Sequence, residues 1–159
     1  MPIPSHLSAF WSTFTAAVGG VDERRFLEAF SFGDSPALAD ELADLVLRGV
    51  KRATTSALWT YEAGGNPLPQ PGDLSIVLRG DGEPVCVIQT ASVEVLPWRA
   101  VTAEFAAAEG EGDGSLAFWQ AAHSDLFSRE CARGGREFSD DMPVVCERFT
   151  MPYPPRAGS

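Results

Sequence analysis

Gly49-Val50-Lys51-Arg52-Ala53-Thr54-Thr55-Ser56 joins the clearest helix of the sequence to a segment rich in β-branched residues. Ser35 is a good N-cap for that helix, and proline is well tolerated at the next position, in the first helical turn. One apolar stripe then follows at helical spacing, formed by Leu38, Leu42, Leu45 and Val46. Because Gly49 is a natural residue just past a helix end, the stretch after it is expected to be a loop that enters a strand.

The rest of the chain alternates irregularly between helices and strands. We expect helices over 5–18, 99–108 and 115–133, and strands over 74–78, 84–96 and 144–151. Residues 22–32 are ambiguous between a short helix and a strand, and 59–65 form a short turn or helix. No steady βαβ series and no glycine-rich phosphate loop is present. The sequence therefore predicts an α+β fold with a small mixed or antiparallel sheet that can curl into a barrel, and helices packed outside it.

Composition limits the classes of protein and ligand. The 159 residues suit one domain, and 45% hydrophobic residues can form a packed core. The net charge of −10 disfavours a non-specific coating of nucleic acid but leaves room for a local site. The three cysteines lie far apart, with no Cys-x-x-Cys pair, which favours a reducing compartment. With neither a secretory signal nor a membrane-length apolar stretch, we expect a cytoplasmic protein.

Lys51 is the only lysine among the 12 basic residues. One interpretation is a coding bias towards arginine; the other is that this position needs an amine whose pKa can be shifted. Lys51 can meet the Thr54 hydroxyl only if the chain bends near Arg52 and Ala53, and it can then take the hydroxyl proton if burial or Arg52 lowers its pKa. The structural alternative is a helix C-terminus neutralised by Lys51 and Arg52, followed by a threonine-rich strand.

A second candidate is the acidic, glycine-spaced stretch Glu109-Gly110-Glu111-Gly112-Asp113. Its three carboxylates can bind a cation or place one acid in a pocket, although the spacing differs from that of an EF-hand loop. Alternatively, they favour the N-terminus of the helix that Ser115 caps.

That helix contains the third candidate, His123, which is either an acid–base residue or a hydrogen-bonded packing residue. The basic residues around it and around Lys51 can form a positive cleft; they are Arg48, Lys51, Arg52, Arg129, Arg133 and Arg136. Aromatic residues offer stacking surfaces for a base, or else belong to the core; they are Trp59, Tyr61, Trp98 and Trp119.

In their order along the chain, these motifs resemble the ASCH domain family, in particular its bacterial stand-alone members. The resemblance covers nearly the whole chain and rests on 32–35, 49–56, Tyr61-Glu62, 69–73, 109–116 with Trp119 and His123, and 141–149. It implies a PUA-like β-barrel with a cleft beside the Gly-x-Lys-x-x-Thr segment, in a family linked to RNA. We expect a single domain over 1–159, with a core over about 30–151, the helix 5–18 packed on it and a loose tail over 152–159.

One small bacterial member of this family hydrolyses the acetyl group of N4-acetylcytidine with a lysine, a threonine and a glutamate. The resemblance places these roles on Lys51, Thr54 and Glu109. Thr54 would attack, Lys51 would serve as base, and Glu109 would hold Lys51 or protonate the leaving amine. Backbone N–H groups or Arg52 would stabilise the oxyanion. Substrate-binding residues are expected around these three: Arg52, Thr55, Ser56, Tyr61, Trp119, His123 and Arg129.

A ribonuclease in the same family makes RNA cleavage the second enzymatic possibility. Lys51 and an arginine would then neutralise phosphate, and Glu109, Glu111 or Asp113 could hold Mn²⁺ or Mg²⁺. Amide hydrolysis requires no cofactor. The alternative to both is a non-catalytic module that binds RNA or a nucleotide in the same cleft. The expected partners are RNA or a modified nucleoside, with no DNA and no membrane, and the oligomeric state stays open.

Overall fold

The computed structural model describes residues 2–155. Helices and strands follow one another in the order η1 Ser5–Leu7, α1 Ser8–Ala17, η2 Glu23–Arg25, β1 Phe26–Phe30, α2 Pro36–Leu47, β2 Ala53–Ala57, α3 Leu58–Gly64, β3 Leu74–Leu78, β4 Pro84–Pro97, η3 Trp98–Ala100, α4 Ala103–Glu109, α5 Leu116–Arg133 and β5 Pro143–Tyr153. Within this range, no helix has the length and apolarity that crossing a membrane requires. The predicted tail was partly wrong, because β5 continues to Tyr153; residues 156–159 lie outside the described range.

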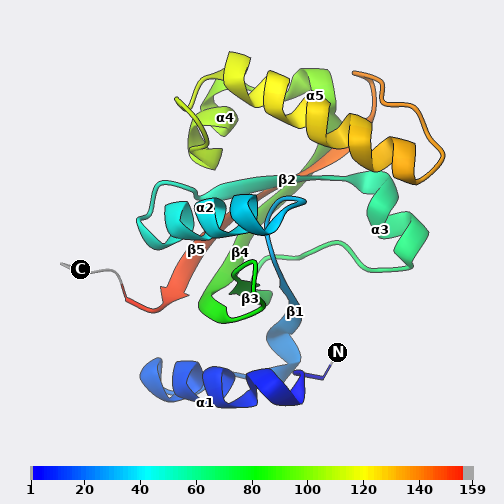
Figure 1. The fold of residues 1–159 in the computed structure, drawn as a ribbon. Helices are drawn as coiled ribbons and strands as arrows, with labels where there is room; N and C mark the ends of the chain where they lie inside the picture. Colours follow the sequence, from blue (N-terminus) through cyan, green and yellow to red (C-terminus); the bar gives the residue numbers. More distant parts are fainter. Residues whose placement is uncertain (1, 156–159) are drawn as a thin grey trace.

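The five strands form one mixed sheet in the order β1-β3-β4-β5-β2. β1 runs parallel to β3, and the other neighbouring pairs are antiparallel. Helices α4 and α5 lie above β2 at one end of the molecule, and α1 lies at the opposite end below β1 (Figure 1). The α+β class and the mixed sheet are therefore confirmed.

The predicted closed barrel is wrong. Within residues 2–155, β1 pairs only with β3 and β2 only with β5, so these two strands are the free edges of the sheet. The space between the edges is a cavity of about 380 Å³, bordered by Glu28 and Phe30 of β1 and by residues 54–57 of β2. Side chains of α3 and α5 also line it, and this cavity separates the two edges that a barrel would join.

Local sequence explains where the helices begin. Ser35 accepts a hydrogen bond from the Leu38 N–H at 3.2 Å, and Ser115 caps α5 in the same way, as predicted. The predicted helix over 99–108 is two shorter elements, because Thr102 caps a new helix by accepting from the Phe105 N–H at 3.1 Å. The ambiguous stretch 22–32 resolves into η2 and the edge strand β1.

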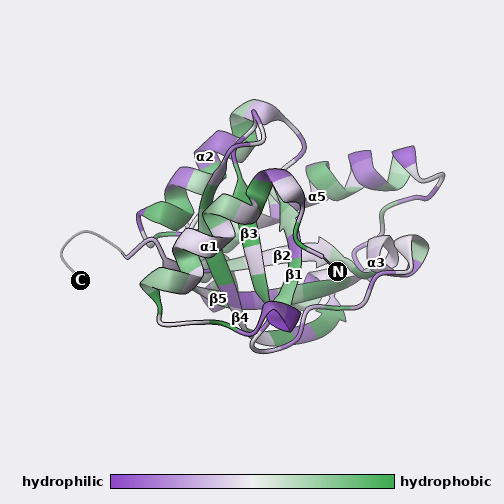
Figure 2. Ribbon diagram, turned by 90° about the horizontal axis from the view of Figure 1, so that it is seen from below, coloured by the Kyte–Doolittle hydropathy of each residue, from purple (hydrophilic) through white to green (hydrophobic). Residues whose placement is uncertain are grey.

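Three apolar clusters hold the layers together. One lies between α4, α5 and the β2–β5 pair, and a second lies beneath α2. The third packs η1 and α1 onto β1, β3 and β4 through Leu7 of η1 and Trp11 and Phe14 of α1. Figure 2 views the molecule from this end, with α1 in front of the strands that it covers. The N-terminal helix is thus an integral part of the core.

Replacing Phe14 tests this packing. Phe14 is 1% exposed and its ring lies against Trp11. Phe14→Ala is expected to lower the free energy of unfolding by about 3–5 kcal/mol, since it removes a large buried side chain and leaves a cavity. Thr13→Ala, on the exposed side of the same helix, is the control and should change the free energy of unfolding by less than about 0.5 kcal/mol. Urea denaturation followed by circular dichroism measures both; equal effects would contradict the packing.

Candidate functional site

Lys51 lies where the end of α2 meets the end of α4. Its N–H and that of Val50 donate to the Leu45 carbonyl of α2 at 3.1 and 3.0 Å. The Arg52 N–H donates to the Ala108 carbonyl of α4 at 2.8 Å. This bend just before β2 turns the Lys51 side chain inwards, and the residue is only 1% exposed. The chain therefore bends before Thr54, but within residues 2–155 the Thr54 hydroxyl forms no hydrogen bond with Lys51, so the pairing of these two groups stays a prediction.

The Lys51 ammonium donates to three acceptors. Nζ lies 2.8 Å from the Ala53 carbonyl oxygen, 3.0 Å from Glu109 Oε1 and 2.9 Å from Glu111 Oε2. Burial by itself lowers the pKa of Lys51, but the two carboxylates outweigh it and the pKa is raised. The expectation that burial makes Lys51 a base is therefore wrong: in this arrangement it stays an ammonium.

Glu109 is the centre of the buried polar network. Its Oε2 accepts from Thr55 Oγ1 at 2.5 Å and from Trp119 Nε1 at 2.6 Å, and it lies 3.4 Å from His123 Nε2. Burial alone would raise the pKa of Glu109, but Lys51 and His123 lower it by more than burial raises it. The pKa therefore lies well below that of an ordinary glutamate, and the group stays ionised. We call Lys51, Glu109, Glu111 and His123 the Lys51 network.

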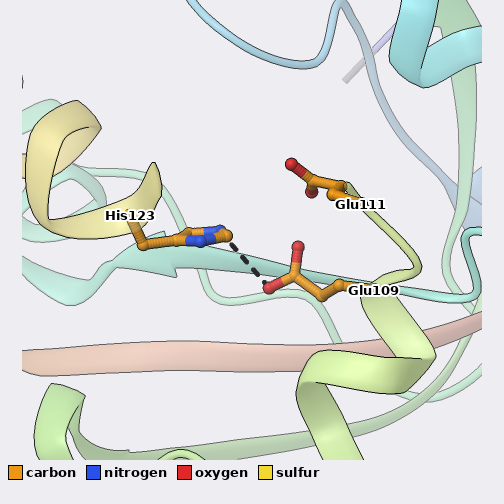
Figure 3. A group of neighbouring side chains, drawn as sticks. All are labelled: Glu109, Glu111 and His123. Atoms are coloured by element: carbon orange, nitrogen blue, oxygen red, sulfur yellow. Dashed lines mark ion pairs between the residues drawn. The ribbon is translucent and has the colours of Figure 1, made fainter. Parts of the chain in front are cut away.

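The two glutamates of this network have opposite pKa shifts. Burial and the neighbouring Glu109 raise the pKa of Glu111, although Lys51 opposes them. Two carboxylates that share one ammonium cannot ionise equally easily. Glu109 has Thr55, Trp119 and His123 as further partners, so Glu111, which lacks them, retains its proton to higher pH. The Glu111 side chain is 17% exposed against 1% for Glu109. Figure 3 shows Glu111 extending from the loop after α4 beside Glu109, with His123 facing Glu109 from α5.

His123 is held by the backbone of its own helix. Nδ1 lies 3.0 Å from the Trp119 carbonyl oxygen, which can only accept, so Nδ1 carries a proton. The ring stacks on Trp119 at a centroid distance of 4.3 Å. Burial lowers the pKa of His123, but the contact with Glu109 outweighs this and the pKa is raised. Nε2 therefore faces Glu109 as a donor whenever the ring is charged.

Gly110 allows the acidic loop to approach Lys51. Its φ is +69°, and a Cβ there would lie 2.4 Å from the Val50 carbonyl oxygen. Gly112, at φ +58°, packs equally closely on the Phe118 ring. Because the backbone of Val50 leaves no room for a side chain at position 110, glycine there lets the loop that carries Glu111 pass close to Lys51. Asp113 is not part of the network: it is exposed and accepts from the Ser115 N–H at 2.9 Å, as the helix-start alternative predicts.

Two cavities meet at Thr54. The Lys51 cavity, about 410 Å³, lies between α2 and α5 with the Lys51 network along one wall. The polar cavity, about 380 Å³, is the one between the free edges of the sheet. Both are lined by Phe32, Gly33, Thr54, Thr55 and Leu126. Thr54 is half-buried, and its hydroxyl forms no hydrogen bond with any other residue of the range 2–155. It is therefore available to a ligand in either cavity.

The predicted positive cleft is wrong. Among the described residues that line the two cavities, the basic ones are Lys51 and Arg129. The acidic ones are Glu28, Glu41, Glu109, Glu111, Asp125, Glu130 and Glu147. Arg129 pairs with Asp34 at 2.9 Å and with Asp125, while Arg136 lies over the Trp59 ring, 4.7 Å from its centroid. The positive charge of Arg129 is thus neutralised by Asp34, which is distant in sequence, and by Asp125 of the same helix, while Arg136 lies outside both cavities.

The remaining predicted substrate-binding residues divide into two groups. Ser56 and Tyr61 line the polar cavity, Thr55 lines both cavities, and His123 and Arg129 line the Lys51 cavity. Arg52 is exposed and lines neither cavity. Trp119 is buried and holds Glu109, and the other two candidate tryptophans pack against the core, as the core alternative predicts.

The oxygen and nitrogen atoms of Glu109, Glu111 and His123 lie close enough together to hold a metal ion. Lys51 already supplies the positive charge there, at 3.0 and 2.9 Å from the two carboxylates. A cation would have to displace a buried ammonium that has no other carboxylate partner among residues 2–155. As folded, this donor set therefore suits a lysine rather than a resident metal ion.

Comparison with known proteins identifies the relatives of this architecture. The sequence profile of the ASCH domain matches residues 28–153. The ASCH domain from Lactobacillus crispatus JV V101 is 38% identical, with a TM-score of 0.85 over 96% of this chain and 98% of that one. A protein from Enterococcus faecalis V583 is 32% identical, with a TM-score of 0.82 over 91% and 86%. ASCH from Zymomonas mobilis, 10% identical with a TM-score of 0.50 over 80% and 71%, shares the fold alone. Among curated proteins, no significant match was found.

Lys51→Met tests the charge balance of the network. The change leaves buried Glu109 without its cation, so the free energy of unfolding at pH 7 should fall by about 3–5 kcal/mol. In the wild type, the lowered pKa of Glu109 stabilises the folded protein at pH values above 4.5, the ordinary pKa of a glutamate. This stabilisation is lost as the pH falls through the lowered pKa. In the variant the carboxyl prefers its proton, so the difference from wild type should shrink on acidification.

Denaturant titrations of both proteins at several pH values measure this difference. Arg148→Met is the control, because it removes an exposed cation paired with Glu104 at 2.8 Å. Its effect should stay within about 1 kcal/mol. A Lys51→Met protein as stable as wild type at neutral pH would contradict the buried charge balance.

Proposed function

The chain belongs to the ASCH domain family, a PUA-like fold linked to RNA, and from that premise we propose that it hydrolyses the acyl–nitrogen bond of a small N-acylated nucleoside of the N4-acetylcytidine type. One observation carries this proposal. The Thr54 hydroxyl, without a protein partner within residues 2–155, lies at the junction of two cavities, one of which contains the Lys51 network. Lys51, Thr54 and Glu109 are also the positions that the family resemblance selects.

Thr54 supplies the nucleophile in this reaction. Its oxygen attacks the acyl carbon, the bond from that carbon to nitrogen breaks, and the acyl group passes to Thr54. Water then releases the acid and restores the hydroxyl. A threonine needs a base for the first step, since its hydroxyl is a weak nucleophile at neutral pH.

Glu111 is the proton carrier that the geometry favours. It lines the same cavity as Thr54 and is the most exposed carboxyl of the network. Its raised pKa makes it a better base than an ordinary glutamate near neutral pH. In our proposal it takes the Thr54 proton and returns it to the leaving nitrogen. Lys51 keeps Glu111 in place and offers a positive charge close to the developing oxyanion, while Glu109 anchors Lys51.

The charges around the cavities favour a nucleoside over a long RNA. Acidic side chains dominate both linings, and Arg129 is occupied by Asp34 and Asp125. A chain of phosphates would approach these carboxylates at an electrostatic cost. A neutral modified nucleoside, free or as one unstacked base, avoids that cost. We therefore rank amide hydrolysis above phosphodiester cleavage.

We also propose that no metal ion is needed, since Lys51 occupies the position between Glu109 and Glu111. The cytoplasm is the proposed compartment. Three buried cysteines, Cys86, Cys131 and Cys146, are all unpaired, which suits reducing conditions.

Acetate release from N4-acetylcytidine tests the proposed nucleophile. The wild type should release acetate, and EDTA should not stop it. Thr54→Val keeps the shape but removes the hydroxyl, so kcat should fall by at least about 100-fold, whereas Thr54→Ser should keep measurable activity. Melting temperatures confirm that the variants fold. If clean wild-type protein binds the nucleoside without releasing acetate, the chain is a binding module and the catalytic proposal fails.

The pH profile tests Glu111 as base. A base must be ionised, so kcat/KM should fall as pH drops through the Glu111 pKa, which lies above the ordinary value of 4.5. Above that pKa, Glu111→Gln should lower kcat/KM by about 10²–10⁴-fold, because the amide cannot take a proton; below it the difference from wild type should shrink, because the wild-type carboxyl is itself protonated. Glu111→Asp should recover part of the rate. Near-normal kinetics in Glu111→Gln would remove Glu111 from the mechanism.

A further inference from the structure

The two cavities that meet at Thr54 differ in chemistry. The Lys51 cavity has an apolar wall on its α2 side, formed by Leu38, Leu42 and Leu45, and a second one on α5 with Phe118 and Ala122. Apart from the Lys51 network, its polar groups are Thr54, Thr55, Glu41, Asp125 and Arg129. A small apolar group beside a carbonyl oxygen suits this cavity, since the apolar walls accept the first and Lys51 attracts the second.

Hydrogen-bond acceptors and hydroxyl groups line the polar cavity. Carboxyl groups enter it from three elements: Glu28 from β1, Glu130 from α5 and Glu147 from β5. No arginine or lysine of residues 2–155 lines it. The other polar residues there are Ser31, Thr54, Thr55, Ser56, Thr60, Tyr61, Asn66 and Ser75. An anionic ligand would be repelled here, whereas N–H donors would find partners on several sides.

The sheet register aims two of these carboxyls at Thr54 and its surroundings. Glu147 of β5 is the partner of Thr54 in the β2–β5 ladder, so their side chains lie next to each other on one face. Glu28 of β1 is the partner of Ser75 of β3, and both line the cavity. Glu147 is already held by the Thr90 hydroxyl at 2.7 Å. The carboxyls are thus positioned by paired strands and not by mobile loops.

Both carboxyls are half-buried, and burial raises the pKa of each. Burial therefore destabilises the ionised form of each carboxyl, and a hydrogen-bond donor from a ligand would reduce this destabilisation. A carboxylate accepts from an amino group, and a carboxyl that keeps its proton can also donate to a ring nitrogen. In the Lys51 cavity the carboxyl groups among residues 2–155 differ: Glu109 and Glu111 are paired with Lys51, Asp125 is paired with Arg129, and Glu41 is exposed.

We propose that the polar cavity binds the amine half of the substrate through Glu28 and Glu147, while the acyl group enters the Lys51 cavity, so that the scissile bond lies over Thr54. This assignment rests on the proposed function and adds its specificity: the preferred ligand presents N–H groups of an aminated, cytosine-like ring to acidic side chains. A ring with a carbonyl in place of the amino group is discriminated against, because it offers fewer N–H donors to these carboxyls than the aminated ring does. The polar cavity shares Glu28, Tyr61 and Asn66 with a larger groove of about 740 Å³, which leaves room for the rest of the ligand.

Equilibrium binding of cytidine and uridine tests the assignment without depending on turnover. Isothermal titration calorimetry on wild type should give cytidine an affinity at least about tenfold higher than that of uridine, a ratio that one unpaired buried polar group can produce. Glu28→Gln and Glu147→Gln should each weaken the binding of cytidine by about three- to tenfold, and each should reduce the ratio of the cytidine affinity to the uridine affinity. Glu62→Gln, which removes an exposed carboxyl that lines neither cavity, should leave both affinities unchanged.

The Thr54→Val protein separates this inference from the proposed function. It should keep the preference for cytidine although it lacks the nucleophile. If wild type releases no acetate but still prefers cytidine, the catalytic proposal fails and the assignment of the amine half stands. Equal affinities in wild type, or an unchanged ratio in both glutamine variants with normal melting temperatures, would overturn the assignment.

Discussion

The burial of one ammonium constrains the architecture around this site. Lys51 is almost completely removed from water, and a buried charge is tolerable only when opposite charge and hydrogen bonds compensate it. Glu109, Glu111 and the Ala53 carbonyl supply that compensation. To bring them together, the chain ends α4 against the bend at residues 50–52 and continues through Gly110, where a side chain would strike the Val50 carbonyl. Trp119 and Thr55 then orient Glu109 from two other elements.

Local features of the sequence predicted local features of the fold. Ser35 and Ser115 were identified as caps because capping depends on residues three positions apart. The lone lysine was identified as unusual from composition. The direction of its pKa shift was not predictable, because Glu109 and Glu111 lie 58 and 60 residues further along the chain. Burial alone would have lowered that pKa; the fold decides the sign by adding two carboxylates.

The open sheet and the acidic cavities were missed for the same physical reason. Whether a curled sheet closes depends on whether its edges meet, and α3 and α5 contribute side chains to the space between β1 and β2. Similarly, arginines clustered in the sequence do not form a positive cleft when one is paired with acidic groups, as Arg129 is, and others lie outside the cavities. Asp34 lies 95 residues before Arg129 and still pairs with it. The net charge of −10, which is a sum over all residues, predicted poor binding of polyanions, and the mostly acidic lining of the two cavities agrees with that prediction.

The separation of charge between the two cavities also explains why Thr54 is a suitable reaction centre. In one direction lies an ammonium already balanced by carboxylates, so its positive charge is fixed in position before a ligand enters. In the other direction lie the half-buried carboxyls of Glu28 and Glu147, whose only side-chain hydrogen bond within residues 2–155 is the one that the Thr90 hydroxyl donates to Glu147. In the proposed reaction, electron density increases on the amide oxygen during the attack by Thr54, on the side of the ammonium. The nitrogen takes a proton before it leaves, on the side of carboxyls that can accept its N–H groups. This arrangement of charge is the physical basis of our proposal, and the free edges of the sheet would provide the space in which the amine leaves.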